Sequence, residues 1–286
     1  MKYASFLHHK RHSWGVVAGD HIADIGTMPG TSMPTLRKAL LSASAQQIIA
    51  AAAGASKLKL ADVVFDPVIP DPDKIICVGL NYENHRKETG RDVVQYPTIF
   101  TRFANTQIGH GVPIVGPRAS THLDFEGELA IIIGTAGRHI PKDKAMAHIA
   151  GYACYNDVSV RDWQRHTIQF TPGKNFPATG PFGPYLVTPD EVGPLPHLKL
   201  VTRLNGTIVQ ETILGDMIFD IPTIITYCST FTPLEIGDVI VTGTPGGVGA
   251  KRTPPLWMKA GDTVEVEIDR VGLLCNRIVD EASVKA

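Results

Sequence analysis

Short runs of apolar and β-branched residues, separated by glycine, proline and acidic residues, dominate the chain and predict a strand-rich protein. In the larger part of the chain, helical periodicity is confined to residues 142–148, 160–164 and 221–231. Strands that do not alternate regularly with helices argue against Rossmann and TIM-barrel folds. We therefore expect an α+β fold, a rolled β-sandwich or barrel with outer helices. Its predicted strands are 75–79, 98–103, 112–115, 128–134, 152–156, 198–204, 239–242, 263–268 and 272–277.

The first part of the chain has a different pattern. Short predicted strands at 3–7, 14–17 and 21–25 precede two predicted helices at 35–44 and 45–53. The segment 66–73 follows, and its three prolines predict a stiff connector. We therefore expect two domains, a small N-terminal α/β domain at residues 1–70 and a larger, strand-rich domain at residues 71–286.

Closely spaced acidic residues precede one of the most apolar runs of the chain. Glu126 and Glu128 lead directly into residues 129–133, and alternate residues of a strand share one face. Two carboxylates at the edge of a core need a positive partner, and Mg²⁺ or Mn²⁺ suits carboxylate oxygens. Asp157 is the predicted third ligand. Asp124 extends the acidic row by one step, so the spacing leaves open which acids bind, and a solvated strand face is the alternative.

His85 and Glu88 are three residues apart after the strand 75–79, so a helix there would bring them into contact. A carboxylate that orients an imidazole makes a base able to take a proton from water, although an ordinary surface pair has the same spacing. Lys174 stands in an uncharged stretch and is either an anion ligand or a surface side chain. The glycine-rich segment 242–249 either binds an anion through its N–H groups or forms a tight turn.

Composition narrows the class of protein. The 286 residues carry a formal net charge of −1, without a basic stripe, so neither nucleic acid nor an anionic membrane is an expected partner. No apolar run approaches the roughly 18 residues that cross a bilayer, and the first residues lack the apolar core of a secretory signal. Four widely spaced cysteines indicate a reducing compartment. We expect a cytoplasmic enzyme.

These segments together resemble the fumarylacetoacetate hydrolase family over residues 74–280, in order and with compatible spacing. The resemblance is to the subgroup of acylpyruvases and hydroxyhepta-diene-dioate isomerases that carry a small N-terminal domain. The matching residues are Gly79-Leu80-Asn81-Tyr82, His85 and Glu88, Asp124, Glu126, Glu128-Leu129, Asn156-Asp157-Val158-Ser159, Arg161-Asp162, Gln164, Gly173-Lys174, Phe176, Asp216-Met217-Ile218-Phe219, Gly237-Asp238-Val239-Ile240, Thr242-Gly243-Thr244-Pro245 and Gly247-Val248-Gly249.

The resemblance implies a mixed β-sandwich roll, a homodimer, and Mg²⁺ or Mn²⁺ at Glu126, Glu128 and Asp157. It makes His85 and Glu88 a water-activating pair on a lid. It also implies a place beside the metal for Lys174, a place in the pocket for Gln164, and a loop at Gly243 and Thr244 that receives a substrate carboxylate. Arg102 stands where many relatives have lysine, and we expect it to grip a carboxylate in two-point contact.

The activity implied is hydrolysis of a carbon–carbon bond in a β-diketo acid of acylpyruvate or fumarylpyruvate type, releasing pyruvate and a carboxylic acid. The alternative is decarboxylation of an oxaloacetate-type acid, or keto–enol or double-bond isomerisation, at the same metal site. Those reactions need no hydrolytic water, so the presence of both His85 and Glu88 favours hydrolysis. A non-catalytic anion-binding module would leave the carboxylates without a purpose.

Overall fold

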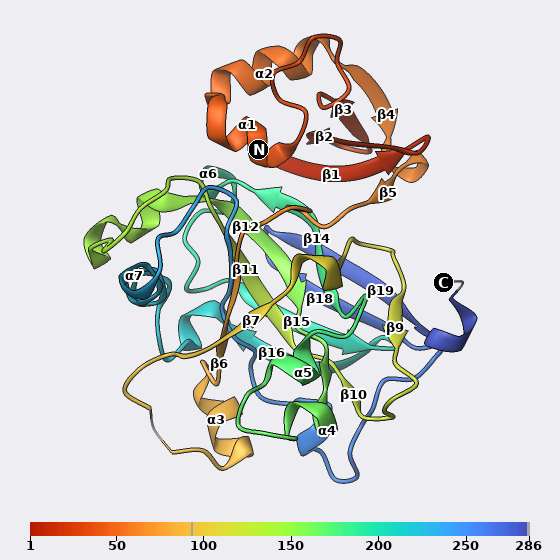
Figure 1. Ribbon diagram of the computed structural model, residues 1–286, viewed down its shortest axis with the longest axis vertical. Coiled ribbons are helices and arrows are strands. Elements are labelled where there is room, and N and C mark those ends of the chain that lie inside the picture. Colours follow the sequence, from red (N-terminus) through yellow and green to blue (C-terminus); the bar gives the residue numbers. More distant parts are fainter. Residues whose placement is uncertain (93, 285–286) are drawn as a thin grey trace.

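The computed structural model describes residues 1–92 and 94–284 and has the expected α+β architecture, rich in strands (Figure 1). A 12-stranded sheet, in the order β4-β3-β2-β1-β14-β12-β11-β17-β6-β7 with β5 on β1 and β8 on β14, packs against a 5-stranded sheet in the order β16-β15-β18-β19-β9. The strands of the larger sheet are β1 (Lys2–His8), β2 (Arg11–Ala18), β3 (His21–Asp24), β4 (Ser56–Lys59), β5 (Val64–Phe65), β6 (Ile75–Gly79), β7 (Thr98–Arg102), β8 (Gln107–Ile108), β11 (Gly127–Ile133), β12 (Ile149–Asn156), β14 (Gly180–Val187) and β17 (Val239–Val241).

The remaining elements complete the roll. The smaller sheet contains β9 (Ile114–Gly116), β15 (Lys199–Leu204), β16 (Thr207–Ile213), β18 (Thr263–Ile268) and β19 (Gly272–Asp280), and β10 (Leu123–Asp124) pairs with β13 (Ser159–Val160). The α-helices are α1 (Leu36–Ser42), α2 (Ala45–Gly54), α3 (Glu83–Thr89), α4 (Arg161–Gln164), α5 (Thr171–Lys174), α6 (Pro189–Val192) and α7 (Ile221–Phe231). The 3₁₀ turns are η1 (Leu60–Asp62), η2 (Ala104–Thr106), η3 (Lys142–His148), η4 (Leu214–Asp216), η5 (Gly249–Lys251) and η6 (Glu281–Ser283).

Strand β11 lies at the centre of the core. Leu129, Ile131 and Ile133 pack in one hydrophobic cluster, and Ala130 and Ile132 pack in a second cluster on the opposite face. Every residue of β11 is buried. The strand that carries the predicted acids is therefore fixed on both faces, which gives a rigid base for a site at its beginning.

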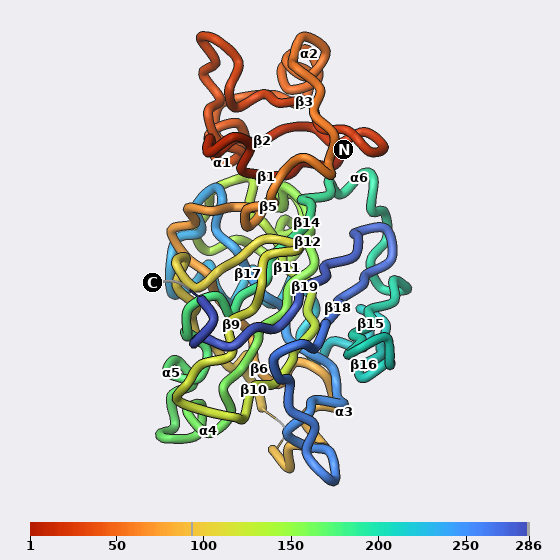
Figure 2. The backbone as a smooth tube through the Cα atoms, turned by 90° about the vertical axis from the view of Figure 1, so that its right-hand side faces the viewer, coloured from red at the N-terminus to blue at the C-terminus, as the bar shows by residue number. Residues whose placement is uncertain are grey.

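The N-terminal strands β1 to β5, with α1 and α2, form the upper part of the molecule in Figure 1. They are continuous with the rest of the fold, because β1 pairs with β14 through Lys2 opposite Val187 and Tyr3 opposite Leu186. The division at residue 70 therefore stays a prediction. The helices α3, α4 and α5 lie at the other end of the molecule, as the tube in Figure 2 also shows.

Several elements differ from those expected from the sequence. Strand β14 was not predicted, because Pro181, Gly183 and Pro184 are typical of turns, yet it lies inside the large sheet between β1 and β12. The expected helix at 142–148 is the 3₁₀ turn η3. Within the part of the chain that the structure describes, none of the helices combines the length and the apolarity that crossing a membrane requires.

Candidate functional site

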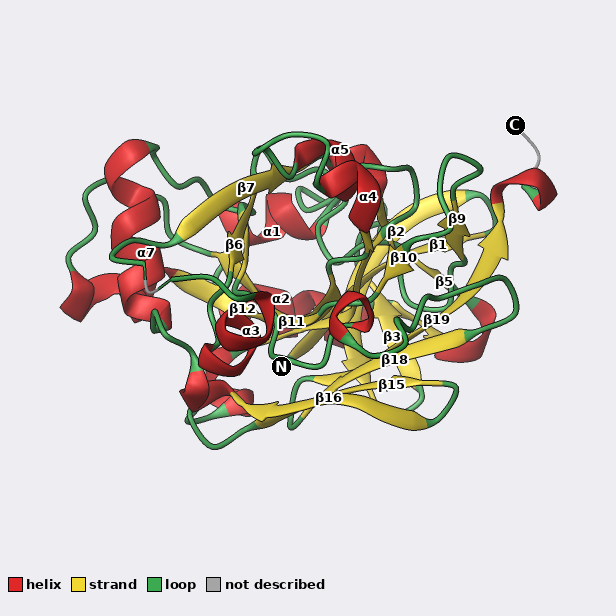
Figure 3. Cartoon of the chain, turned by 90° about the horizontal axis from the view of Figure 1, so that it is seen from below, coloured by secondary structure: helices red, strands yellow, loops and turns green. Residues whose placement is uncertain are grey.

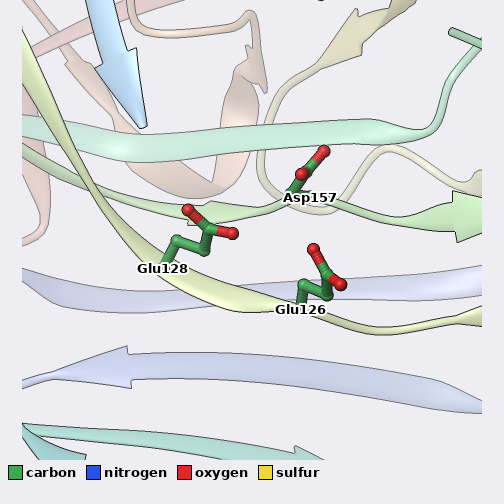
Figure 4. A group of neighbouring side chains, drawn as sticks. All are labelled: Glu126, Glu128 and Asp157. Carbon is green, nitrogen blue, oxygen red and sulfur yellow. The ribbon is translucent and has the colours of Figure 1, made fainter. Parts of the chain in front are cut away.

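The three predicted metal ligands lie together where β11 begins and β12 ends (Figure 4). Glu126 precedes β11 and Glu128 lies within it, so both side chains leave the same face. Asp157 follows β12, and its N–H donates to the Glu126 carbonyl at 2.8 Å. One carboxylate oxygen from each residue lies within 4.8 Å of the other two, and all three residues are buried. Strand pairing thus brings distant acids into one cluster.

Asp124, whose place the sequence left open, has a different task. Its carboxylate accepts the N–H groups of Gly249 and Ala250 at 2.8 and 2.9 Å and the Nε of Arg161 at 2.8 Å. Arg161 in turn pairs through Nη1 with Glu126 Oε1 at 2.7 Å. Asp124 therefore holds Arg161, and Arg161 holds a metal-ligand candidate. No role for Arg161 was expected from the sequence, because nothing local shows which acids it would meet.

Lys174 lies inside the carboxylate cluster. Its Nζ is 2.6 Å from both Glu126 Oε2 and Asp157 Oδ2, and its side chain is 1% exposed. Burial lowers the pKa of Lys174, but the charges of Asp157 and Glu126 outweigh burial and raise it, so the side chain is an ammonium. The structure thus places Lys174 beside the carboxylates and not on the surface.

Glu128 is the carboxyl group of the cluster without a cationic partner among the described residues. Its Oε2 accepts the Gly243 N–H at 2.5 Å, and it makes no ion pair with any residue that the structure describes. Burial, and then the charges of Asp157 and Glu126, raise the pKa of Glu128 well above its ordinary value. Burial acts in the same direction on Glu126, but Arg161 and Lys174 lower the pKa of that carboxyl to about 2. Without a cation beside it, Glu128 is therefore the carboxyl of the cluster that most resists ionisation.

The donor set fits a hard divalent cation. Mg²⁺ binds oxygen atoms at about 2.0–2.1 Å in an octahedron, so neighbouring ligand oxygens lie about 3 Å apart and opposite ones about 4 Å. One carboxylate oxygen from each of the three residues lies within 4.8 Å of the other two, close to this spacing. A dication would also supply the countercharge that Glu128 lacks. Glu126, Glu128 and Asp157 therefore form a candidate divalent-metal site, and their oxygens suit Mg²⁺ and Mn²⁺ alike.

Helix α3 brings His85 and Glu88 into contact, as their spacing predicts. His85 Nδ1 lies 2.7 Å from Glu88 Oε1, and the His85 side chain is 7% exposed. Glu88 Oε2 accepts the N–H of Gly247 at 2.9 Å, which ties the helix to the glycine-rich loop. Since Glu88 occupies Nδ1, the Nε2 of His85 is the ring nitrogen available to a ligand. His85 is buried and Glu88 is half-buried against the loop, so the alternative of a solvated surface pair does not hold.

The glycine-rich loop binds carboxylates, but they belong to the chain itself. The Gly243 N–H donates to Glu128, so the prediction that it receives a substrate carboxylate is wrong. Thr244 Oγ1 donates to the Gly127 carbonyl at 3.0 Å and accepts from Gln210 Nε2 at 2.8 Å. Thr244 also borders the cavity described below, and its predicted substrate contact stays a prediction.

Arg102 does not reach the cavity, so the expectation that it grips a substrate carboxylate is corrected. Its side chain is fully buried, with Nη1 at 2.6 Å from Asp157 Oδ1 and 3.1 Å from the Val158 carbonyl, and Nη2 at 2.8 Å from Thr179 Oγ1. The two-point contact of the guanidinium is made with the protein interior. Arg102 is therefore a positioning residue for Asp157.

A cavity of about 150 Å³ lies over the carboxylates. Gln164 borders it and accepts a hydrogen bond from Arg161 Nη1 at 3.0 Å. Of the residues predicted for the site, His85, Glu126, Glu128, Gln164, Lys174 and Thr244 line this cavity, while Glu88, Arg102, Asp157 and Gly243 support it from behind. Three further cations that were not expected at the site from the sequence also line the cavity, namely Arg91, Arg165 and Lys251.

Comparisons with known proteins place the chain in a family. The family model "Fumarylacetoacetate (FAA) hydrolase C-terminal" matches residues 74–279. The chain is 39% identical over 266 residues to the Homo sapiens protein named oxaloacetate tautomerase FAHD2A, mitochondrial, with 91% of this chain and 85% of the relative covered.

Two solved structures share the fold across nearly the whole chain. The fumarylacetoacetate hydrolase of Exiguobacterium antarcticum is 34% identical, with a TM-score of 0.87 and coverage of 98% of this chain and 100% of that one. The maleylpyruvate hydrolase of Sphingobium sp. SYK-6, solved with manganese(II) and pyruvate, is 29% identical, with a TM-score of 0.81 and coverage of 98% and 99%. The chain belongs to the fumarylacetoacetate hydrolase family.

Proposed function

We propose that this protein is a divalent-metal-dependent enzyme that interconverts the keto and enol forms of an oxaloacetate-type 2-keto acid. The observation that carries the proposal is one small cavity shared by the metal-ligand candidates and by His85, a proton carrier. The name of the human relative supports the same reaction and favours isomerisation over the hydrolysis expected from the sequence. The carboxylates suit either Mg²⁺ or Mn²⁺ as the cofactor.

The cavity residues account for the proton movement. A dication held by Glu126, Glu128 and Asp157 would polarise the 2-keto acid group as a Lewis acid. His85 would take a proton from the carbon next to the keto group, and the keto oxygen would gain one, so that a C–H bond is exchanged for an O–H bond. The charge on Lys174 stabilises the negative oxygen during this exchange. Glu88 keeps the His85 ring in orientation.

A second candidate is hydrolysis of an acylpyruvate. The contact between His85 Nδ1 and Glu88, which leaves Nε2 for a water molecule, favours it. The maleylpyruvate hydrolase with the same fold gives this reaction a precedent among structural neighbours. The two reactions differ in whether a carbon–carbon bond is broken, and product analysis separates them.

The test starts from metal-stripped protein that receives Mn²⁺ or Mg²⁺ and a fresh solution of enol-form oxaloacetate. We expect the enol absorbance to decay faster than with the metal alone, with no matching pyruvate. Pyruvate from oxaloacetate would instead show a decarboxylase, and pyruvate from an acylpyruvate panel would show the hydrolase. Enol decay no faster than the metal-only background would refute the proposal.

We further propose that the protein is a homodimer with a small keto acid as its ligand, as the family resemblance implies, and that it is cytoplasmic, as its cysteine usage and the lack of an apolar leader indicate. Light scattering on the eluting peak of a size-exclusion column measures the mass directly. A monomer mass near 30.9 kDa would contradict the dimer without bearing on the reaction.

A further inference from the structure

The cavity over the carboxylates contains more positive than negative side chains. Two of its cations, Arg161 and Lys174, are paired with carboxylates. Three others, Arg91, Arg165 and Lys251, line the cavity without an ion pair to any residue in 1–92 and 94–284. We call these three the cationic rim. Cations that share a cavity and lack partners within the protein favour an anionic ligand.

The rim is held in place by backbone structure. The N–H of Arg91 donates to the Arg86 carbonyl at the end of α3, and the N–H of Arg165 donates to the Asp162 carbonyl at the end of α4. Lys251 closes the 3₁₀ turn η5, with its N–H donated to Val248. The rim thus comes from three segments far apart in sequence. Two of them, α3 and α4, appear in Figure 3 at the end of the molecule that faces the viewer.

A second observation indicates that a hydrogen-bond acceptor of the ligand lies near the buried carboxylates. Arg161 is 6% exposed in its side chain and borders the cavity, and its Nη2 is buried without a hydrogen-bond partner among the described residues. A buried donor without an acceptor destabilises the protein, so a ligand oxygen at this position would remove that penalty.

The charge balance fits a ligand with two negative groups. The buried centre holds the carboxylates Asp124, Glu126, Glu128 and Asp157 and the cations Arg102, Arg161 and Lys174, and a dication makes this centre net positive. One carboxylate of a diacid then binds at the centre, and the rim meets the other. The volume of about 150 Å³ equals that of a cavity that holds benzene, so a short diacid fits.

We infer that the cationic rim of Arg91, Arg165 and Lys251 binds the distal carboxylate of a short 2-keto dicarboxylic acid and so selects diacids over monoacids. This inference rests on the proposed function for the placement of the 2-keto acid end at the metal-ligand candidates. It assigns substrate selection to residues outside the metal site. These residues are specificity-determining and take no part in proton transfer.

The test compares two dianions of different length on the full-length, Mn²⁺-loaded protein. Oxalate reaches only the centre, whereas 3,3-difluorooxaloacetate reaches the rim and cannot enolise. Calorimetric titration gives both dissociation constants for the wild type and for Arg91→Gln, Arg165→Gln and Lys251→Gln. Arg138→Gln, an exposed arginine outside the cavity, controls for the change in net charge.

We expect each rim substitution to weaken difluorooxaloacetate binding about three- to tenfold, as for partly exposed charge-assisted contacts, and the triple substitution about a hundredfold. Oxalate binding should change less than about twofold, because oxalate carries the same charge as difluorooxaloacetate but is too short to reach the rim. Equal losses for both ligands, or no loss for either, would overturn the inference.

The proposed function and the rim fail in different ways. If oxaloacetate is not tautomerised but the rim substitutions weaken difluorooxaloacetate binding more than oxalate binding, the inference about the rim is supported and the proposed reaction is refuted. If tautomerisation is fast and the rim variants bind both ligands like the wild type, the proposed reaction is supported and the inference about the rim is refuted. Circular dichroism and Mn²⁺ affinity, which the rim substitutions should leave unchanged, show that each variant is folded and loaded.

Discussion

Replacing Arg102 with methionine tests whether this arginine holds a metal ligand or a substrate. In the structure Arg102 Nη1 is 2.6 Å from Asp157 Oδ1, and Nη2 is 2.8 Å from Thr179 Oγ1. The Arg102→Met substitution keeps most of the apolar volume and removes the charge. Asp157 would then keep Lys174 as its remaining cationic contact.

The loss of stability follows from the burial of the pair. Removing one partner of a buried ion pair costs about 3–5 kcal/mol, and the contact from Lys174 places Arg102→Met near the lower value. A loss of about 3 kcal/mol lowers the melting temperature of a chain of this size by about 6–12 °C. Mn²⁺ next to Asp157 replaces part of the missing charge, so the deficit should shrink by about 1 kcal/mol or more at saturating metal.

Urea unfolding with and without Mn²⁺ measures both the loss of stability and the part of it that the metal restores. Thr179→Val is the matched control: it removes the hydroxyl that accepts from Arg102 and donates to the Phe176 carbonyl, leaves the Arg102–Asp157 pair in place, and should cost about 1–3 kcal/mol. At saturating metal, the KM of Arg102→Met for oxaloacetate should stay within about twofold of wild type, because the side chain lies outside the cavity. A KM raised about tenfold with unchanged stability would show that Arg102 reaches the substrate, and the reasoning would be refuted.

Other substitutions test the remaining parts of the site. Because burial raises the pKa of Glu128, metal-free protein should lose stability as pH rises above the ordinary carboxyl range; Glu128→Gln should remove this slope in urea unfolding, and parallel curves would contradict it. His85→Asn should lower turnover by on the order of 10²–10⁴ while calorimetry finds Mn²⁺ affinity within about twofold of wild type; a matching loss of affinity would make His85 structural. Gly247 has φ +101° and a Cβ there would lie 2.4 Å from the Val209 carbonyl oxygen, so Gly247→Ala should cost about 1–3 kcal/mol, and a neutral result would refute this strain.

The sequence predicted those parts of the molecule that follow from local pattern. Apolar runs bounded by turn residues located β6, β18 and α7 at their observed bounds. The alternation rule placed Glu126 and Glu128 on one face, and the i, i+3 spacing joined His85 to Glu88. Each of these features is set by residues only a few positions apart.

The parts that failed depend on contacts between distant segments. Strand β14 contains two prolines, and only its neighbours β1 and β12 make a strand of it. The guanidinium of Arg102 is as suited to a substrate carboxylate as to Asp157, and the fold decides between them. Likewise, the N–H of Gly243 was expected to face an external anion, but β11 brings Glu128 to it first. For both Arg102 and Gly243, contact with a carboxylate was predicted correctly, but the carboxylate belongs to the protein and not to a ligand.

The charge distribution of the site links metal and substrate binding. Without a dication, the four carboxyl groups of the buried centre offset its three cations, and the centre has no net positive charge to attract a dianion. A dication beside Glu128 makes the centre net positive, so that the centre and the cationic rim attract the same ligand. Metal should therefore raise the affinity for a short diacid, and by thermodynamic linkage the diacid must raise the affinity for metal by the same factor. The rim would thus contribute to metal retention although none of its residues is a candidate ligand.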